Sequence, residues 1–292
     1  MKYGVNTFIW TGRFDRSHLS LLPQIKEHGF DGAELPLYDP AQFPAADIRH
    51  ACERYGLECT ICAVLTGGAN VISDDPAVRA RTRGHLADCI KAVAEAGSTI
   101  MAGPLYSPVG FLPGRRRTAD EWKWAVNSYQ SLGPLLAKHG VTIALEPINR
   151  FETYFLNTAA DAVKLCDEIN HPNVGILLDT FHANIEEKDI GQAYRSVARH
   201  LKHVHTCEND RGIPGSGHVE WNSVFAALRE MQYDGWLTIE GFGFAIEELS
   251  AAASIWRDLA TSPEAIAWEG IRFLKQNTSI PAPASGISRE KC

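Results

Sequence analysis

Four apolar runs in the second half of the chain are VTIALEP (141–147), VGILLD (174–179), KHVHTCE (202–208) and WLTIEGF (236–242). Each contains a side chain that can bind a metal ion at or near its end, and these are Glu146, Asp179, His205 and Glu240. Val, Ile and Leu predominate before each of them, which is typical of strands buried on both faces of a parallel sheet. Positions 146, 179, 205 and 240 are 33, 26 and 35 residues apart, about the length of one strand and one helix. The pattern predicts parallel strands with polar side chains at their carboxyl ends.

The rest of the chain repeats this alternation, so we predict an α/β protein with the fold of a single (β/α)8 TIM barrel. Four further strands are expected at 3–10, 30–35, 57–65 and 98–105. Helices are expected at 18–28, 45–55, 75–96, 119–139, 158–169, 189–199, 222–231 and 246–276. A doubly wound open sheet would also alternate, but it usually has a Gly-rich turn after its first strand, and this chain has none there.

The length also suits one barrel, because 292 residues is somewhat more than the roughly 250 that a barrel needs. We therefore predict one catalytic domain over residues 1–277. Residues 278–292 are rich in Pro, Ser and Ala, and we predict that they form a disordered tail.

Composition excludes several classes of function. A net charge of −7 and an isoelectric point near 5.9 argue against a nucleic-acid or anionic-membrane partner. No apolar run approaches the ~18 residues of a membrane span. The seven cysteines mostly lie in apolar segments, which suits reduced core thiols better than disulfides. We therefore predict a cytoplasmic protein.

The four side chains at the strand ends predict a metal site. In a closed parallel barrel the carboxyl ends of all strands open on one face, where such barrels place their chemistry. Three carboxylates and one imidazole there suit one divalent cation. Such a cation polarises the oxygens of a ketone and a hydroxyl, which favours removal of a proton beside the ketone. If Glu146 and Glu240 flank one carbon, proton removal by one and return by the other inverts that carbon, so the pattern indicates an epimerase.

Polar residues in the loops after these strands are candidates to hold a polyhydroxylated substrate. Glu152, His182 and Arg211 follow the fifth, sixth and seventh strands. Each also has an ordinary explanation, as a solvated loop acid, a turn residue or a surface arginine. Asn149, Arg150 and Glu208 occupy the same loops.

Two other features leave alternatives open. Phe8 and Trp10 end the predicted first strand, where they either line a pocket or pack under a loop. Residues 115–117 are three consecutive arginines, most simply a solvated turn, with a phosphate clamp as the alternative.

On these residues the chain resembles the ketose 3-epimerases, the group of D-tagatose, D-allulose (D-psicose) and L-ribulose 3-epimerases among the xylose-isomerase-like barrels. The most specific stretches are LEPINRFE (145–152), LNTAA (156–160), LDTFHANIEE (178–187) and the run from 205 to 217. The resemblance extends over nearly the whole chain.

The resemblance implies a site and a reaction. It assigns Glu146, Asp179, His205 and Glu240 to one divalent metal ion, with Mn²⁺ the first choice and Co²⁺ or Mg²⁺ the others. Glu146 and Glu240 would exchange the C3 proton of a free ketose through a cis-enediolate. Glu152, His182 and Arg211 would hold O1 and O2 of the sugar. Relatives are homodimers or homotetramers.

The resemblance does not define the ketose. Pro108-Val109-Gly110 and Gly241 depart from the usual residues in loops at the far end of the sugar. The competing hypotheses are a related sugar isomerase, an inosose dehydratase or isomerase, or a hydroxypyruvate isomerase of the same superfamily. A metal-dependent nuclease would need more histidine ligands and a basic face. A non-catalytic sugar-binding barrel would predict an incomplete ligand set.

Overall fold

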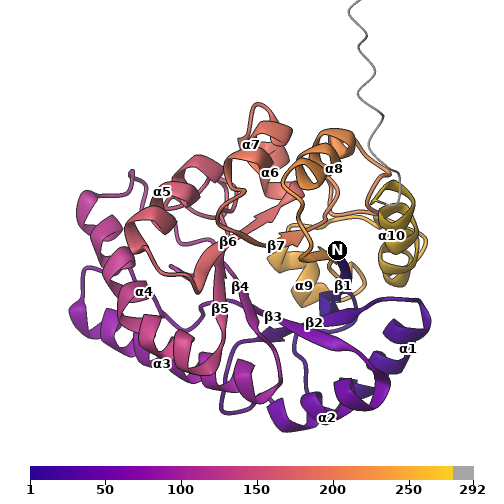
Figure 1. The fold of residues 1–292 in the computed structure, drawn as a ribbon, viewed down its shortest axis with the longest axis horizontal. Helices are drawn as coiled ribbons and strands as arrows, with labels where there is room; N and C mark the ends of the chain where they lie inside the picture. Colours follow the sequence, from indigo (N-terminus) through magenta and orange to yellow (C-terminus); the bar gives the residue numbers. More distant parts are fainter. Residues whose placement is uncertain (279–292) are drawn as a thin grey trace, which may run out of the picture.

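The computed structural model describes residues 1–278, and they form a closed barrel of eight parallel strands surrounded by helices (Figure 1). The strands are β1 (Lys2–Asn6), β2 (Gly32–Leu37), β3 (Glu58–Ala63), β4 (Ile100–Gly103), β5 (Thr142–Leu145), β6 (Val174–Asp179), β7 (Leu201–His205) and β8 (Trp236–Ile239). They pair in chain order and β1 closes the barrel against β8. The predicted TIM barrel is confirmed.

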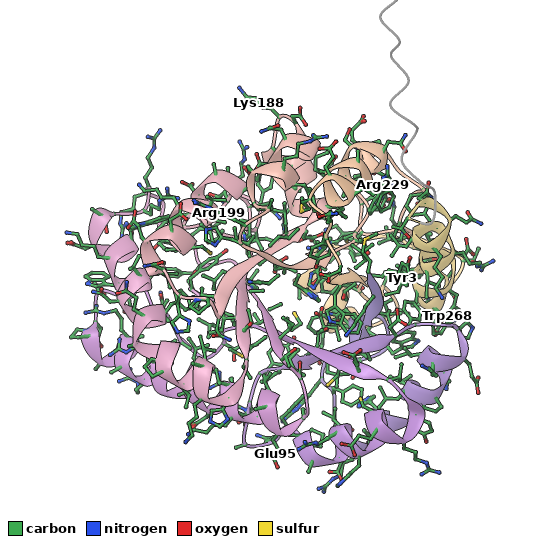
Figure 2. All side chains as sticks on the ribbon, viewed as in Figure 1. Tyr3, Glu95, Lys188, Arg199, Arg229 and Trp268 are labelled. Carbon is green, nitrogen blue, oxygen red and sulfur yellow. The ribbon has the colours of Figure 1, made fainter. Side chains whose placement is uncertain are left out.

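Most of the helices follow one another around the outside of the barrel in chain order, whereas α9 is drawn inside this outer circle, next to β1 (Figure 1). They are α1 (Leu21–Glu27), α2 (Ala45–Tyr55), α3 (Pro76–Glu95), α4 (Ala119–His139), α5 (Ala159–Ile169), α6 (Thr180–Glu186), α7 (Ile190–Ser196), α8 (Trp221–Glu230), α9 (Glu247–Ala252) and α10 (Pro263–Thr278). Charged side chains such as Glu95 and Lys188 project from this outer layer (Figure 2). None of the helices within residues 1–278 is both long and apolar enough to span a membrane.

Local chemistry explains where the helices begin and end. The Thr118 side chain accepts a hydrogen bond from the Glu121 backbone, and the Glu121 side chain accepts one from the Thr118 backbone, so α4 starts with a capping box. Gly56 and Gly140 end α2 and α4 in the left-handed conformation that glycine adopts without strain. Asp75 and Pro76 open α3 in the same way as predicted from the sequence.

Several element boundaries differ from the sequence-based prediction, and two of the differences affect the site. The first strand stops at Asn6, whose side chain accepts from the Phe8 backbone and starts a 3-10 turn, η1 (Thr7–Ile9). The last predicted helix is two helices, α9 and α10, separated by residues 253–262. Thr278 ends α10, and the rest of the predicted tail, 279–292, lies outside the described residues.

The core lies between the sheet and the helices, and a smaller apolar layer fills the barrel itself. Strands β2, β6 and β8 are buried along their whole length. Ala102, Ala144 and Leu177 pack together as a separate cluster. A side chain larger than hydrogen at Gly103 would meet the Ala63 carbonyl at 2.3 Å, so close strand packing requires glycine there. Polar side chains occupy the remaining interior, and they build the site.

Candidate active site

The four side chains predicted as metal ligands lie together at the carboxyl ends of the strands. Glu146 follows β5, Asp179 ends β6, His205 ends β7 and Glu240 follows β8. All four are buried, with Asp179 and His205 fully enclosed. Because parallel strands share one direction, four side chains at equivalent strand ends must meet at one mouth of the barrel.

The four side chains lie close to one another in a closed ring, which is called the ring below. His205 Nδ1 lies 3.3 Å from Glu240 Oε1 and 3.8 Å from Glu146 Oε1. Oxygens of Glu146 and Asp179 approach one another within 4.8 Å, as do oxygens of Asp179 and Glu240. His182 Nε2 sits 3.7 Å from both Glu146 Oε1 and Asp179 Oδ2. Four donor atoms therefore surround one small region.

This ring attracts positive charge. Burial, together with the neighbouring carboxylates, raises the pKa of Glu146 well above its usual value. Burial likewise raises the pKa of Asp179 to about 7, against the opposing effect of Arg211. Burial disfavours a charged imidazole, but the carboxylates of Glu34 and Glu240 outweigh it and raise the pKa of His205 well above its usual value. Each shift favours a bound proton, and a divalent cation competes for the same groups.

Arg211 partly neutralises the ring. Its Nη1 lies 3.2 Å from Asp179 Oδ2 and 2.5 Å from Glu240 Oε2. Burial alone would raise the pKa of Glu240, but His205 and Arg211 prevail and lower it to about 2. The guanidinium also stacks 3.8 Å over the Phe181 ring. Arg211 has a backbone φ of 67°, so the loop is bent to bring this side chain inward.

The ring fits a divalent cation. His205 Nδ1 and Glu146 Oε1 are buried atoms without a hydrogen-bond partner, and both face the ring. Such orphaned groups are rare in folded proteins unless an ion or water satisfies them. Once a cation displaces the protons, the three carboxylates and the guanidinium would carry a net charge of −2. Three oxygens and one imidazole nitrogen are also a donor set that divalent ions such as Mn²⁺ accept.

A second group of residues lies next to the ring and is organised by Asn149. The Asn149 backbone N–H donates to His182 Nδ1 at 3.1 Å, and its side-chain amide donates to Glu152 Oε1 at 2.8 Å. Because His182 Nδ1 accepts, the hydrogen of the neutral imidazole is on Nε2, which faces the ring. Burial, with the charge of Arg211, lowers the pKa of His182 well below its usual value, so its imidazole is neutral.

A cavity of about 340 Å³ opens over this site. Glu146, Glu240, Glu152, His182 and Arg211 line its inner end. Its outer wall is mainly apolar and includes Phe8, Tyr38, Val64, Leu65, Pro108, Val109, Phe242 and Leu249. Helix α9 contributes Leu249 and Ala252 to this wall, so it covers the mouth. A small polar molecule with one reactive end suits this shape.

The structure resolves the alternatives for two aromatic residues. Phe8 lines the cavity and stacks on Phe242 at 5.4 Å between ring centroids. Trp10 instead packs on Trp268 of α10, with ring centroids 5.3 Å apart, and does not line this cavity. The switch from strand to 3-10 turn after Asn6 sends the two rings in different directions.

Several polar residues in the loops at the mouth do not line the cavity but bind neighbouring segments of the chain. The Glu208 carboxylate accepts from three backbone N–H groups and from Trp221 Nε1 at 2.9 Å. Arg150 pairs with Glu186 through two nitrogens. Of the three consecutive arginines, Arg115 pairs with Glu121 of α4 and Arg117 with Asp161 of α5. This segment is therefore a clasp that joins its loop to these two helices, and not merely a solvated turn.

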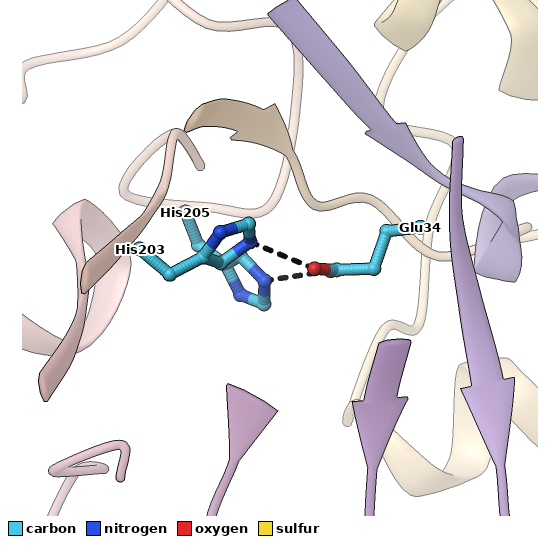
Figure 3. Close-up of side chains that lie close together, drawn as sticks. All are labelled: Glu34, His203 and His205. Atoms are coloured by element: carbon cyan, nitrogen blue, oxygen red, sulfur yellow. Dashed lines mark hydrogen bonds and ion pairs between the residues drawn. The ribbon is translucent and has the colours of Figure 1, made fainter. Parts of the chain in front are cut away.

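Glu34 and His203 belong to the site but were not predicted. The Glu34 carboxylate lies within the barrel, 2.7 Å from His205 Nε2 and 2.7 Å from His203 Nε2 (Figure 3). One signal was present in the sequence: Glu34 is an acid inside an apolar strand segment, FDGAEL (30–35). His203 is two residues before His205 and therefore points to the same face of β7.

Known proteins resemble this chain over most of its length. A family model described as xylose isomerase-like TIM barrel matches residues 22–277. A probable ketose 3-epimerase of Synechocystis sp. is 37% identical over 276 residues, which is 94% of this chain and 96% of the relative. The chain belongs to the ketose 3-epimerase family. The predicted resemblance is thereby confirmed, and with it the prediction of an isomerase.

Other members of the family show the same extent of similarity. A ketose 3-epimerase of Arthrobacter globiformis is 33% identical and covers 94% of this chain and 96% of its own length. The crystal structure of a D-allulose 3-epimerase from Methylomonas sp. in complex with D-allulose superposes with a TM-score of 0.89. It is 30% identical and the match covers 95% of this chain and 97% of that one.

Proposed function

We propose that this chain is a divalent-metal-dependent ketose 3-epimerase that inverts C3 of a free ketose. The single observation that carries the proposal is the pair of glutamates, Glu146 and Glu240, that line one cavity and both approach His205. Relatives named for D-psicose, L-ribulose and unspecified ketoses support the substrate class. We propose a ketose of the D-tagatose, D-allulose/D-fructose or L-ribulose type.

Glu146, Asp179, His205 and Glu240 would hold the cation. When bound, it would stabilise negative charge on the substrate oxygens at C2 and C3. Mn²⁺ is our first choice, with Co²⁺ or Mg²⁺ as the others, because the donor set combines three carboxylates with one imidazole.

The two glutamates would carry the proton transfer. The ionised carboxylate takes the proton from C3, and the electron pair of that C–H bond forms a C2–C3 double bond while the C2 carbonyl becomes an oxyanion. The result is a cis-enediolate. The other glutamate, in its protonated form, then donates a proton to the opposite face of C3, and the carbonyl at C2 is restored with C3 inverted.

Glu152, His182 and Arg211 would hold the O1 and O2 end of the ketose. They line the inner end of the cavity beside the two glutamates. Arg211 and the Nε2–H of His182 can donate to substrate oxygens, while Glu152 can accept from a hydroxyl. With O1 and O2 held in this way, C3 would lie between Glu146 and Glu240.

We also propose a homodimer or homotetramer in the cytoplasm. Phe151 and Trp256 are 71% and 78% exposed, which is unusual for large apolar side chains near one site. Six buried cysteines are free within residues 1–278, as expected for a reducing compartment.

Isotope exchange tests the reaction. Turnover of a panel of ketoses with Mn²⁺ in D₂O should place deuterium at C3 of the epimer, because the proton removed exchanges with solvent. Glu146→Gln and Glu240→Gln should each lower turnover by about 10²–10⁴-fold, the usual effect of losing an acid or base. Bound Mn²⁺ is measured in parallel, since both residues are also proposed ligands. Glu95→Gln, at the exposed end of α3, is the control.

Other outcomes would replace the proposal. Deuterium at C1 would indicate an aldose–ketose isomerase. Turnover without deuterium would indicate hydride transfer, and no turnover of any ketose would remove the assignment.

A further inference from the structure

The carboxylate of Glu34 is fully buried within the barrel, beside His203 and His205 (Figure 3). Four polar side chains from three other strands surround it: Asn6, Thr60, His203 and His205. A buried carboxylate is costly unless its oxygens are paired, and removal of its partners is strongly destabilising. The chain therefore maintains this group at some cost, and the geometry suggests the reason.

Each oxygen of Glu34 has two partners. Oε1 accepts from Asn6 Nδ2 at 2.9 Å and contacts His205 Nε2 at 2.7 Å. Oε2 accepts from Thr60 Oγ1 at 2.9 Å and lies 2.7 Å from His203 Nε2. An ionised carboxylate can only accept, so the hydrogen in the short contact with His205 is on Nε2.

This contact determines what the other nitrogen of His205 can do. A neutral imidazole with its hydrogen on Nε2 presents a lone pair on Nδ1. Nδ1 is the atom that faces Glu146 and Glu240, and it is buried without a hydrogen-bond partner. Carboxylates often orient metal-binding histidines in this way through the nitrogen that does not touch the metal.

We propose that Glu34 is a positioning residue that holds His205 with its Nδ1 lone pair directed at the divalent cation. This inference rests on the proposed function, because that function supplies the cation. His203 contacts the second oxygen, so it keeps the carboxylate from rotating away from His205. Both histidines lie on β7 two residues apart and so reach the same carboxylate.

A competing explanation is that Glu34, His203 and His205 bind an ion of their own, because their donor atoms lie within 4.8 Å of one another. The contacts argue against it. Ligand atoms at about 2.0–2.2 Å from one tetrahedral ion are separated by more than about 3 Å. The two N···O contacts here are both 2.7 Å, which is shorter than that separation, and the contact with His205 is a hydrogen bond.

Metal affinity is the main test. Glu34→Gln preserves the size of the side chain, and Glu34→Ala removes it. Both should weaken Mn²⁺ binding by about 10–100-fold, the usual effect of losing such a partner, in a titration followed by the electron paramagnetic resonance of free Mn²⁺. Thr60→Val is the matched control, because it removes a donor to the same carboxylate but not the link to His205. It should change Mn²⁺ affinity by no more than about 3-fold, well below the 10–100-fold expected for loss of the partner itself.

Steady-state kinetics should distinguish a residue that positions His205 from one that takes part in the reaction. At saturating Mn²⁺ the Glu34→Gln enzyme should recover most of its kcat and keep the KM of the wild type for the ketose, since Glu34 does not line the cavity. A residue needed for the reaction itself would stay deficient at any Mn²⁺ concentration.

A measurement on the wild type keeps the inference testable even if both variants fold poorly. In the Mg²⁺-loaded protein, nitrogen NMR of His205 should show hydrogen on Nε2 and none on Nδ1. Hydrogen on Nδ1, wild-type Mn²⁺ affinity in Glu34→Gln, or two bound ions per chain that fall to one in Glu34→Ala would each overturn it. Weakened Mn²⁺ binding in a chain that epimerises no ketose would uphold this inference and reject only the proposed reaction.

Discussion

Arg211 combines a strained backbone with a buried guanidinium whose two terminal nitrogens contact residues of the site. Its φ of 67° is uncommon for a residue with a β-carbon. One nitrogen contacts both Asp179 and Glu240, and the planar group stacks on Phe181. Strain of this kind persists when surrounding contacts require the residue's position, and it clusters at functional sites. Arg211 is therefore the natural residue to test for substrate binding.

We predict that Arg211→Ala lowers kcat/KM for the best ketose by about 10–100-fold, because a hydrogen bond to a charged group contributes roughly 1.5–3 kcal/mol. Mn²⁺ affinity should be unchanged or higher, since the substitution removes a positive charge beside Asp179 and Glu240. Steady-state kinetics and Mn²⁺ titration measure the two effects. Arg150→Ala, on a neighbouring loop and paired with Glu186, is the control. Full kcat/KM in Arg211→Ala would show that the residue only balances charge.

The residues at the strand ends could be predicted because two simple rules apply to them. Apolar runs identify buried strands, and a polar residue just after such a run must face the mouth. These rules do not reveal hydrogen-bond partners. Glu208 occupies the same kind of position but binds its own loop, where a side chain on Gly217 would meet Glu208 Oε1 at 2.7 Å. Glu34 lies within a strand, and nothing in the local sequence shows that His205 lies beside it.

At the level of elements, Glu121 joins three segments near the mouth. Its carboxylate accepts from Arg115 in the loop before α4, from the Thr118 backbone at the start of α4, and from Tyr154 in the loop after β5. Val109, which lines the cavity, belongs to the same loop as Arg115. The position of that cavity wall therefore depends on this carboxylate.

The pKa of Glu121 predicts the pH range in which its carboxylate stabilises the fold. Burial opposes ionisation, but the hydrogen bonds from Arg115, Thr118 and Tyr154 lower the pKa from 4.5 to about 2. A carboxyl whose pKa is lower in the folded state stabilises the protein fully above its unfolded value of 4.5. That stabilisation is lost as the pH falls from 4.5 toward 2.

We predict that Glu121→Gln lowers the free energy of unfolding at pH 7 by on the order of 2–3 kcal/mol, since one pKa unit corresponds to about 1.4 kcal/mol. The difference in the free energy of unfolding between the wild type and the variant should narrow by about 1 kcal/mol at pH 3.5. At that pH part of the Glu121 carboxyl is protonated, so the wild type has lost part of the stabilisation that it provides. Urea unfolding at both pH values measures it. Asp120→Asn, whose side chain is 69% exposed, should change little at either pH. A gap that stays constant or widens at low pH would contradict this explanation.

The helix ends show what local sequence can predict about elements. Thr118, Gly56 and Gly140 act through their own backbone neighbourhood, so their effect follows from the sequence. The break between α9 and α10 was not predicted. It occurs because α9 turns across the mouth to place Leu249 and Ala252 against the cavity, which depends on the whole barrel. The clasp formed by Arg115 and Arg117 likewise needs partners from α4 and α5.

At the scale of the whole molecule, the mouth has a second hollow beside the first. It measures about 430 Å³ and shares Glu152 and Arg211 with the cavity over the proposed active site. Phe151 and Ile255 line it, and Trp256 stands next to them. Large exposed apolar side chains around one hollow are typical of a surface that binds another protein. A second copy of the chain seated there would also enclose Glu152 and Arg211, the proposed substrate-binding residues.

We therefore predict that replacing both Phe151 and Trp256 with serine raises the dissociation constant of the oligomer at least about 100-fold, because burying one aromatic side chain contributes about 1.5–3 kcal/mol. Light scattering after size exclusion at a series of concentrations should show the monomer.

The control replaces Phe111 and Leu112, which are 43% and 48% exposed, with serine and should keep the oligomer. Dissociation of this control alone would place the interface over the loop before α4 instead. A monomeric wild type would reject the oligomer altogether. If the interface does cover the mouth, the monomeric variant should also bind ketose more weakly, because Glu152 and Arg211 would then be open to water on the side of the second hollow.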